Sequence, residues 1–111
     1  MALKQLKLMA EVQCWALWNM VESDNIDPSS LPISKILIND LNDWSDRFDE
    51  IYKLDAPNFH MSIGFESEEV ENEFYNDGWL LHERLKSEMP NVDFWYRDMR
   101  YQELLQKRPS S

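Results

Sequence analysis

The stretch SEEVENEFYNDGWLLHERLKSEMP, residues 67–90, decides the fold of this chain. Its apolar residues recur every three or four positions and therefore form one stripe along a helix. The predicted stripe comprises Val70, Phe74, Gly78, Leu81, Leu85 and Met89. Ser67 is the expected N-cap, and the glutamates that follow it suit the positive end of the helix dipole. The helix should run to about Met89 and end before Pro90.

Gly78 falls within this stripe. A glycine inside a helix costs about 1 kcal/mol relative to alanine. We therefore expect another element to approach the helix closely at this position, and the alternative is a tolerated helix defect.

Alternating apolar residues on both sides of the helical region predict strands. Residues 91–96 alternate, and residues 6–14 alternate over a longer stretch. The chain then stays apolar from Trp15 to Met20, which allows either a continued strand or a hairpin. We expect the N-terminal and C-terminal strands to pair in one sheet.

A second amphipathic helix is predicted from about Ile33 to Leu54, with Ser34 as candidate N-cap. It follows a loop at residues 22–32 that is rich in turn-forming residues. Its apolar stripe comprises Leu37, Leu41, Trp44, Phe48, Ile51 and Tyr52, and the opposite face carries Asn39, Asp43, Asp46 and Glu50. The connector, residues 55–66, is predicted as a loop in which alternation at 59–65 allows a short strand.

Together these elements predict one α+β domain over residues 1–111. A small sheet formed by the N- and C-terminal strands should carry both amphipathic helices packed on one face. The polar tail, residues 102–111, is expected to fray, although Leu104 and Leu105 could dock as a short helix.

The negative charge of the chain is concentrated in its middle. The formal net charge is −10, and residues 22–93 contain 18 acidic and 5 basic side chains, a local net charge of −13. Such a surface disfavours nucleic acid and anionic membranes as partners, because both repel carboxylates. It favours a basic protein partner, and the alternative is that the charge serves solubility alone.

No motif for catalysis or metal binding is present in the sequence. The two histidines, His60 and His82, do not have the spacing of zinc ligands, and His82 is expected on the surface beside the helical stripe. Cys14 is the only cysteine and falls in the alternating stretch, where a buried thiol acts as a small hydrophobe. We therefore expect no enzyme activity, no cofactor and no metal. Without a signal peptide or a long apolar run, the expected location is the cytoplasm.

Two tryptophans lie outside the predicted core. Trp79 projects about 140° from Phe74 on its helix, and Trp95 shares the charged side of its strand with Asp93 and Arg97. A tryptophan among acidic residues suits a binding hot spot for a basic partner. The alternative is that Trp79 packs beneath the connector or the tail. The candidate partner-binding residues are Asp43, Asp46, Glu50, Glu69, Asn72, Trp79 and Glu83.

Two blocks of sequence resemble a known family. The first is Cys14-Trp15-x-Leu17-Trp18 followed by Leu31-Pro32, and the second is Gly64-Phe65-x-Ser67-x-Glu69 with Phe74, Gly78, Leu81, Leu85, Val92 and Tyr96. In these blocks the chain is similar to small bacterial immunity proteins of contact-dependent growth inhibition and related polymorphic toxin systems. It departs from them in a more apolar connector and in the tail beyond Tyr101.

The resemblance implies a cytoplasmic inhibitor that binds a cognate toxin domain, and we expect the free protein to be a monomer. Such toxins are frequently RNases, and the inhibitor blocks the active site without activity of its own. The resemblance transfers no contact residues, because contacts vary with the toxin. A second hypothesis is a non-catalytic regulatory or assembly module that acts as a homo-oligomer through the apolar stretch from Trp15 to Met20.

Overall fold

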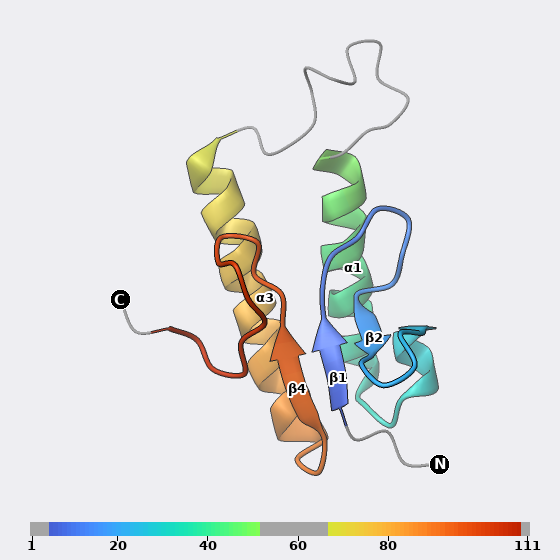
Figure 1. Ribbon diagram of the computed structural model, residues 1–111. Coiled ribbons are helices and arrows are strands. Elements are labelled where there is room, and N and C mark those ends of the chain that lie inside the picture. The colour runs from blue at the N-terminus through green and yellow to red at the C-terminus, as the bar shows by residue number, and fades with distance from the viewer. Residues whose placement is uncertain (1–4, 52–66, 110–111) are drawn as a thin grey trace.

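The structure is a computed structural model that describes residues 5–51 and 67–109. Two long helices pack against one four-stranded mixed sheet (Figure 1), which confirms the predicted α+β class. The elements in chain order are β1 (Gln5–Leu8), β2 (Leu17–Asn19), β3 (Asn25–Ile26), the 3-10 helix η1 (Pro28–Ser30), α1 (Lys35–Ile51), α3 (Glu68–Glu88) and β4 (Asp93–Tyr96). Neither α1 nor α3 combines the length and hydrophobicity that crossing a membrane requires.

The first and last strands lie side by side in the sheet, as predicted. The strand order is β3-β2-β1-β4, with β4 parallel to β1 and the other two pairs antiparallel. Leu6 pairs with Phe94 and Leu8 with Tyr96, and all four side chains are buried. Both helices cover the same face of the sheet (Figure 1). They lie within the long crossover that a parallel strand pair needs.

The N-terminal strand is shorter than its alternation predicted. The expectation of a strand over residues 6–14 is wrong beyond Leu8, because the chain turns in a hairpin loop (residues 9–16) and returns as β2. The Met9 N–H donates to the Ala16 carbonyl (2.8 Å), and Gln13 adopts a positive φ of 59°. Cys14 therefore lies half-buried in this loop rather than in a buried strand. Apolar residues of the loop pack on the core, which explains why the alternation continues past the strand.

Both predicted N-caps are present. Ser34 Oγ accepts from the Leu37 N–H and Ser67 Oγ accepts from the Val70 N–H, each at 3.2 Å. Ser34 also joins the two helices, since its N–H and its hydroxyl donate to the carboxylate of Glu88 at 2.5 and 2.8 Å. The loop predicted at residues 22–32 contains β3 and η1. The expected end of the first helix at Leu54 and the short strand in the connector fall outside the described residues.

The core is organised around Gly78. A Cβ atom at this position would lie 2.8 Å from Trp44 Cζ2 and 2.5 Å from Tyr96 Cζ, and it would collide with the Tyr96 hydroxyl. That hydroxyl donates to the Tyr75 carbonyl (2.9 Å). Trp44 stacks on Phe74 with ring centroids 4.5 Å apart and donates from Nε1 to the Phe74 carbonyl (2.9 Å). The predicted close approach at Gly78 is therefore confirmed.

The chain after β4 folds back over α3 as a C-terminal segment (residues 97–109). Leu105 exchanges two backbone hydrogen bonds with Tyr96, at 2.8 and 3.1 Å, and forms an antiparallel bridge. The expectation of a short helix at residues 104–105 is wrong, because the free edge of β4 offers these residues a backbone partner. The C-terminal segment thereby covers part of an otherwise open sheet edge.

His82 is fully buried, so its expected surface position is wrong. Its ring lies between α3 and β4, where Nε2 is 2.7 Å from the Phe94 carbonyl and therefore carries the shared proton. Among the described residues Nδ1 has no hydrogen-bond partner. The pKa of His82 lies below its ordinary value, mainly because burial disfavours the charged ring. The hydrogen bond to the Phe94 carbonyl opposes this shift, Lys86 adds to it and Glu83 opposes it. The helical stripe is thus wider than the sequence pattern indicated.

We predict that Gly78→Ala lowers the free energy of unfolding by about 1–3 kcal/mol, the usual effect of overpacking a core. The clash with two buried rings should outweigh the gain of about 1 kcal/mol in helix propensity. Chemical denaturation measures the change. The matched control is Glu73→Ala on an exposed position of the same helix, which should stay within about 0.5 kcal/mol of the parent. A Gly78→Ala protein as stable as the parent would contradict the close approach.

We predict that His82 makes the fold less stable as the pH falls through about 6.5, the ordinary pKa of histidine. Below that pH the unfolded chain binds a proton that the folded state, with its lowered pKa, does not. Stability should then fall by at most about 1.4 kcal/mol per pH unit. Denaturation between pH 7.5 and 5 measures the slope. His82→Gln should flatten it and His60→Gln should not; equal slopes in all three proteins would refute the assignment.

Candidate binding surface

The exposed face of α1 carries an acidic ridge, formed by Asp43, Asp46 and Glu50. The ridge residues are spaced by three and four positions, and all three are exposed. They face outward because the opposite side of α1 is buried through Leu37, Leu41, Trp44 and Phe48. Three of the predicted binding residues are therefore brought together on one surface.

Ion pairs within the described residues involve neighbours of the ridge but neither Asp43 nor Asp46. Arg47 Nη1 contacts Asp77 Oδ2 at 2.8 Å, and Arg84 Nη1 contacts Asp40 Oδ2 at 2.6 Å. Both pairs join α1 to α3 and are about half exposed, so each adds little stability. Asp43 and Asp46 form no ion pair or hydrogen bond with any described side chain. Asp43 and Asp46 thus give the ridge a negative charge that is available to a partner.

A hollow lies on each side of the ridge. On the side of α3, a hollow of about 490 Å³ is lined by ridge carboxylates, Arg47 and the apolar side chains of Val70 and Phe74. On the side of the hairpin loop, a second hollow of about 330 Å³ is lined mainly by polar groups. Asp46 borders both hollows, so the ridge separates two concave surfaces.

The four candidates on α3 do not form one exposed cluster. Glu69 is exposed in the first turn of the helix, and Glu83 is exposed beside Lys86, with 3.8 Å between Oε1 and Nζ. These two glutamates are about 21 Å apart along the helix axis, from 14 residues at 1.5 Å each. Asn72 is half-buried and accepts a hydrogen bond from Arg100 Nη1 (3.0 Å). Of these four predicted binding residues, only Glu69 and Glu83 are therefore fully accessible.

Trp79 is a core residue, so its predicted role as an exposed hot spot is wrong. Its exposed fraction is 1%, and its ring meets Tyr96 edge to face at 4.6 Å. Its Nε1 donates to Asp98 Oδ2 (2.8 Å). Trp79 therefore packs beneath residues that follow and end β4, which lie before the tail (residues 102–111) of the alternative expectation. Side chains that are buried in this way cannot contact a partner directly.

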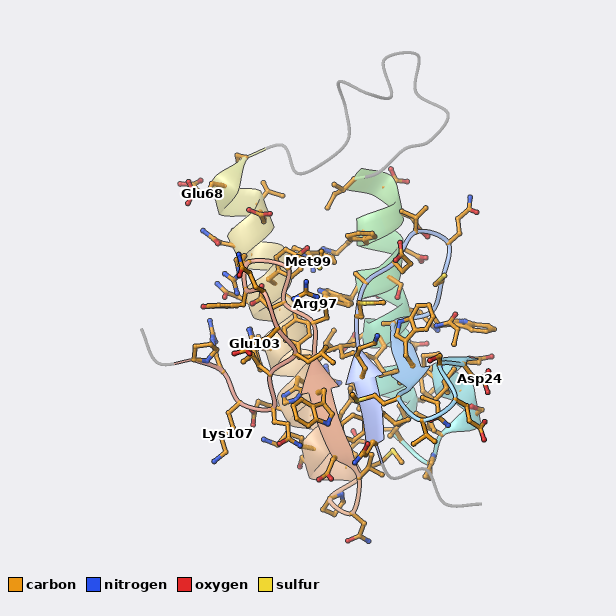
Figure 2. The ribbon with its side chains drawn as sticks, in the orientation of Figure 1. Asp24, Glu68, Arg97, Met99, Glu103 and Lys107 are labelled. Atoms are coloured by element: carbon orange, nitrogen blue, oxygen red, sulfur yellow. The ribbon has the colours of Figure 1, made fainter. Side chains whose placement is uncertain are left out.

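The C-terminal segment binds α3 through Asp98 and Arg100. Asp98 is fully buried and accepts from Trp79 and from Arg100, whose Nη2 lies 2.6 Å from Oδ2. Burial alone would raise the pKa of Asp98, but these hydrogen bonds outweigh it and hold the pKa below its ordinary value. Arg100 and Arg108 also donate to the side-chain oxygen of Asn76. Figure 2 labels Arg97, Met99 and Glu103, which mark the course of the segment after β4.

This basic segment therefore covers the part of α3 around Asn72, Asn76 and Trp79, whereas Glu69 and Glu83 stay exposed. Its arginines bond to neutral amides and to a buried carboxylate, and they leave the acidic ridge of α1 uncovered. The sequence showed that the tail is basic, but only the fold shows that it returns to α3.

A second aromatic group occupies the sheet face that the helices do not cover. Trp18 of β2, Lys7 of β1 and Trp95 of β4 are neighbours across the three strands, and all are half-buried. The Lys7 ammonium lies 5.8 Å from the ring centroid of Trp18, within reach of a cation–π interaction. Trp95 therefore belongs to a packed row rather than to an isolated hot spot.

The described residues hold no group of three histidine, cysteine or carboxylate side chains arranged to bind a metal ion. The geometry instead offers a charged convex surface with adjoining hollows, which suits recognition of another protein. Sequence reasoning missed Trp15, Asn42, Ser45 and Asp49, which line the hollow beside the hairpin loop. The periodicity of α1 could have placed Asn42 and Asp49 near Asp46, but the loop's position was not predictable.

A family model described as Serratia CdiI immunity protein-like matches residues 4–99. No curated protein matches the chain. The matched region contains every strand and both helices of the described structure, together with the acidic ridge. The resemblance inferred from the two sequence blocks is thereby confirmed. The chain belongs to the Serratia CdiI immunity protein-like family, a family of immunity proteins of contact-dependent growth inhibition systems.

Proposed function

We propose that this protein binds the toxin domain of its own growth-inhibition system and neutralises it, and that this toxin is a basic nuclease. The observation that supports the proposal most directly is an exposed acidic ridge, whose Asp43 and Asp46 pair with no described side chain, on a member of an immunity-protein family. A nuclease must hold phosphates, so its active site presents basic side chains. An acidic ridge is complementary to such a surface and also speeds encounter with it.

In this proposal the ridge residues Asp43, Asp46 and Glu50 contact the toxin. Glu69 and Glu83 lie farther along α3 and add to the negative field that steers the toxin toward the ridge. Inhibition is by occupation: the bound protein excludes the nucleic acid, and no reaction on the immunity protein is involved. The complex forms in the cytoplasm, where an RNase meets its substrate.

Asn72 and Trp79 keep a different role in the proposal. They hold the C-terminal segment through Arg100 and Asp98 and so preserve the fold that presents the ridge. Their replacement should act through stability, whereas replacement of a ridge residue should act through affinity.

Co-expression with the toxin domain encoded beside this chain tests the function. We expect cells to survive when both proteins are made and to die when the toxin domain is made alone. Equal killing with and without this protein would refute the proposed immunity. Sedimentation of the isolated protein should give a monomer, and a stable oligomer that ignores the toxin domain would favour the homo-oligomeric module instead.

Reversal of the ridge charge tests the surface. We predict that the triple variant Asp43→Lys, Asp46→Lys, Glu50→Lys weakens toxin binding by about 2 kcal/mol or more, roughly 30-fold in Kd, if the ridge is a hot spot. Calorimetric titration measures the affinity, and circular dichroism verifies the fold. The matched control is Glu22→Lys, Asp24→Lys, Glu103→Lys, which makes the same charge change at exposed positions away from α1. Equal affinities of the two variants would place the interface elsewhere.

A further inference from the structure

The hollow between the hairpin loop and α1 is built from an unusual set of groups. It has a volume of about 330 Å³, and α1 contributes Asn42, Ser45, Asp46 and Asp49 to its wall. The hairpin loop contributes Cys14 and Trp15. Two carboxylates therefore face this hollow, and no basic side chain of the described chain lines it.

The walls of the hollow are held in place by hydrogen bonds. The Gln13 N–H donates to Asp49 Oδ1 (2.7 Å), which ties the loop to α1. The side chain of Asn25 holds the backbone of Trp15 from both directions, accepting from its N–H (3.0 Å) and donating to its carbonyl (2.9 Å). A site whose walls are already fixed loses little entropy when a ligand enters.

Three polar groups that line the hollow have hydrogen-bonding capacity left unused among the described residues. Ser45 is only 7% exposed, and its hydroxyl has no hydrogen-bond partner among the described residues. Buried hydroxyls are normally bonded, so this unpaired one leaves a bonding position open at the wall of the hollow. Asp46 makes no ion pair with a described residue, and Asp49 uses one carboxylate oxygen and leaves the other unused.

We propose that this hollow is an anchor pocket for one arginine side chain of the partner. A guanidinium offers five N–H donors in a plane and remains charged at all relevant pH values, which suits two carboxylates with amide and hydroxyl oxygens beside them. Trp15 is 44% exposed at the rim and presents a ring on which a guanidinium can stack. An anion would be repelled by both carboxylates, and an apolar side chain would leave them unpaired.

The inference rests on the proposed function only in assigning the arginine to the toxin domain. Asp46 belongs to the acidic ridge and also lines the pocket, so one bound surface could cover both. The ridge supplies charge over a broad area, whereas the pocket supplies a single directional contact. Hot spots of this kind are enriched in arginine and sit in preformed cavities.

Titration with a small arginine analogue tests the pocket without any toxin. We expect N-acetylargininamide to shift the indole N–H signal of Trp15 in NMR spectra with saturation, at a Kd on the order of 1 mM, which is usual for a ligand of its size. The uncharged isostere N-acetylcitrullinamide should bind at least tenfold more weakly. Equal responses to both compounds, or shifts that do not saturate, would overturn the proposal.

Two matched variants separate the pocket from the general negative field. Asp46→Asn should weaken N-acetylargininamide binding at least fivefold. Asp43→Asn makes the same change one turn away on the same ridge, outside the pocket lining, and should change the Kd less than twofold. Equal effects of the two variants would show that the compound binds by nonspecific electrostatic attraction, and would refute the proposed pocket.

Alkylation of Cys14, the only thiol of the chain, tests whether the bound toxin domain occupies the pocket, because Cys14 lines it. Occupation by the toxin domain should slow its alkylation by iodoacetamide at least tenfold. A toxin domain that binds and protects cells while leaving the alkylation rate unchanged would overturn the pocket and leave the proposed function standing. Failure of the toxin domain to bind, with normal binding of N-acetylargininamide, would refute the proposed function and leave the pocket standing.

Discussion

The contact between Tyr96 and the backbone of α3 at Gly78 fixes the spacing between the sheet and the helices. The tyrosine ring reaches the helix because no side chain intervenes, and its hydroxyl donates to the Tyr75 carbonyl at 2.9 Å. Trp44 enters the same junction from α1 and stacks on Phe74. One junction thus joins β4, α3 and α1. Because protein interiors are close-packed, a change of size here would be transmitted to all three elements.

The orientation of α1 follows from this junction. With Trp44 directed into the core, Asp43 and Asp46 are directed to solvent, because neighbouring positions on a helix differ by about 100°. The ion pairs Arg47–Asp77 and Arg84–Asp40, which join α1 to α3, lie beside this surface and involve neither Asp43 nor Asp46. The ridge is therefore part of a rigid helix rather than of a flexible loop, and a partner would find it already ordered.

The C-terminal segment places basic side chains against α3, away from the acidic ridge of α1. Arg100 is held by the buried carboxylate of Asp98 and reaches the amides of Asn72 and Asn76. That face of α3 is consequently covered and partly basic, while α1 remains acidic. A chain whose tail stayed free would present basic groups beside its own acidic surface, which would weaken the field that attracts a basic partner.

Local patterns in the sequence determined much of this protein. The α+β class, the pairing of the terminal strands, both N-caps and the acidic positions of α1 all follow from periodicity, capping chemistry and charge, which act over a few residues. The close approach at Gly78 was also predictable, because a glycine in a buried helical stripe leaves room for another element to contact the helix backbone.

Only the tertiary structure decided which of those residues are accessible. Trp79 and His82 appeared to flank the stripe, yet both are buried, because the returning C-terminal segment and β4 widen the covered face of α3. The hollow beside Trp15 exists because a hairpin loop folds onto α1, and a contact across 36 residues between Gln13 and Asp49 holds it there. Periodicity describes one element at a time, whereas burial depends on which distant segments meet it.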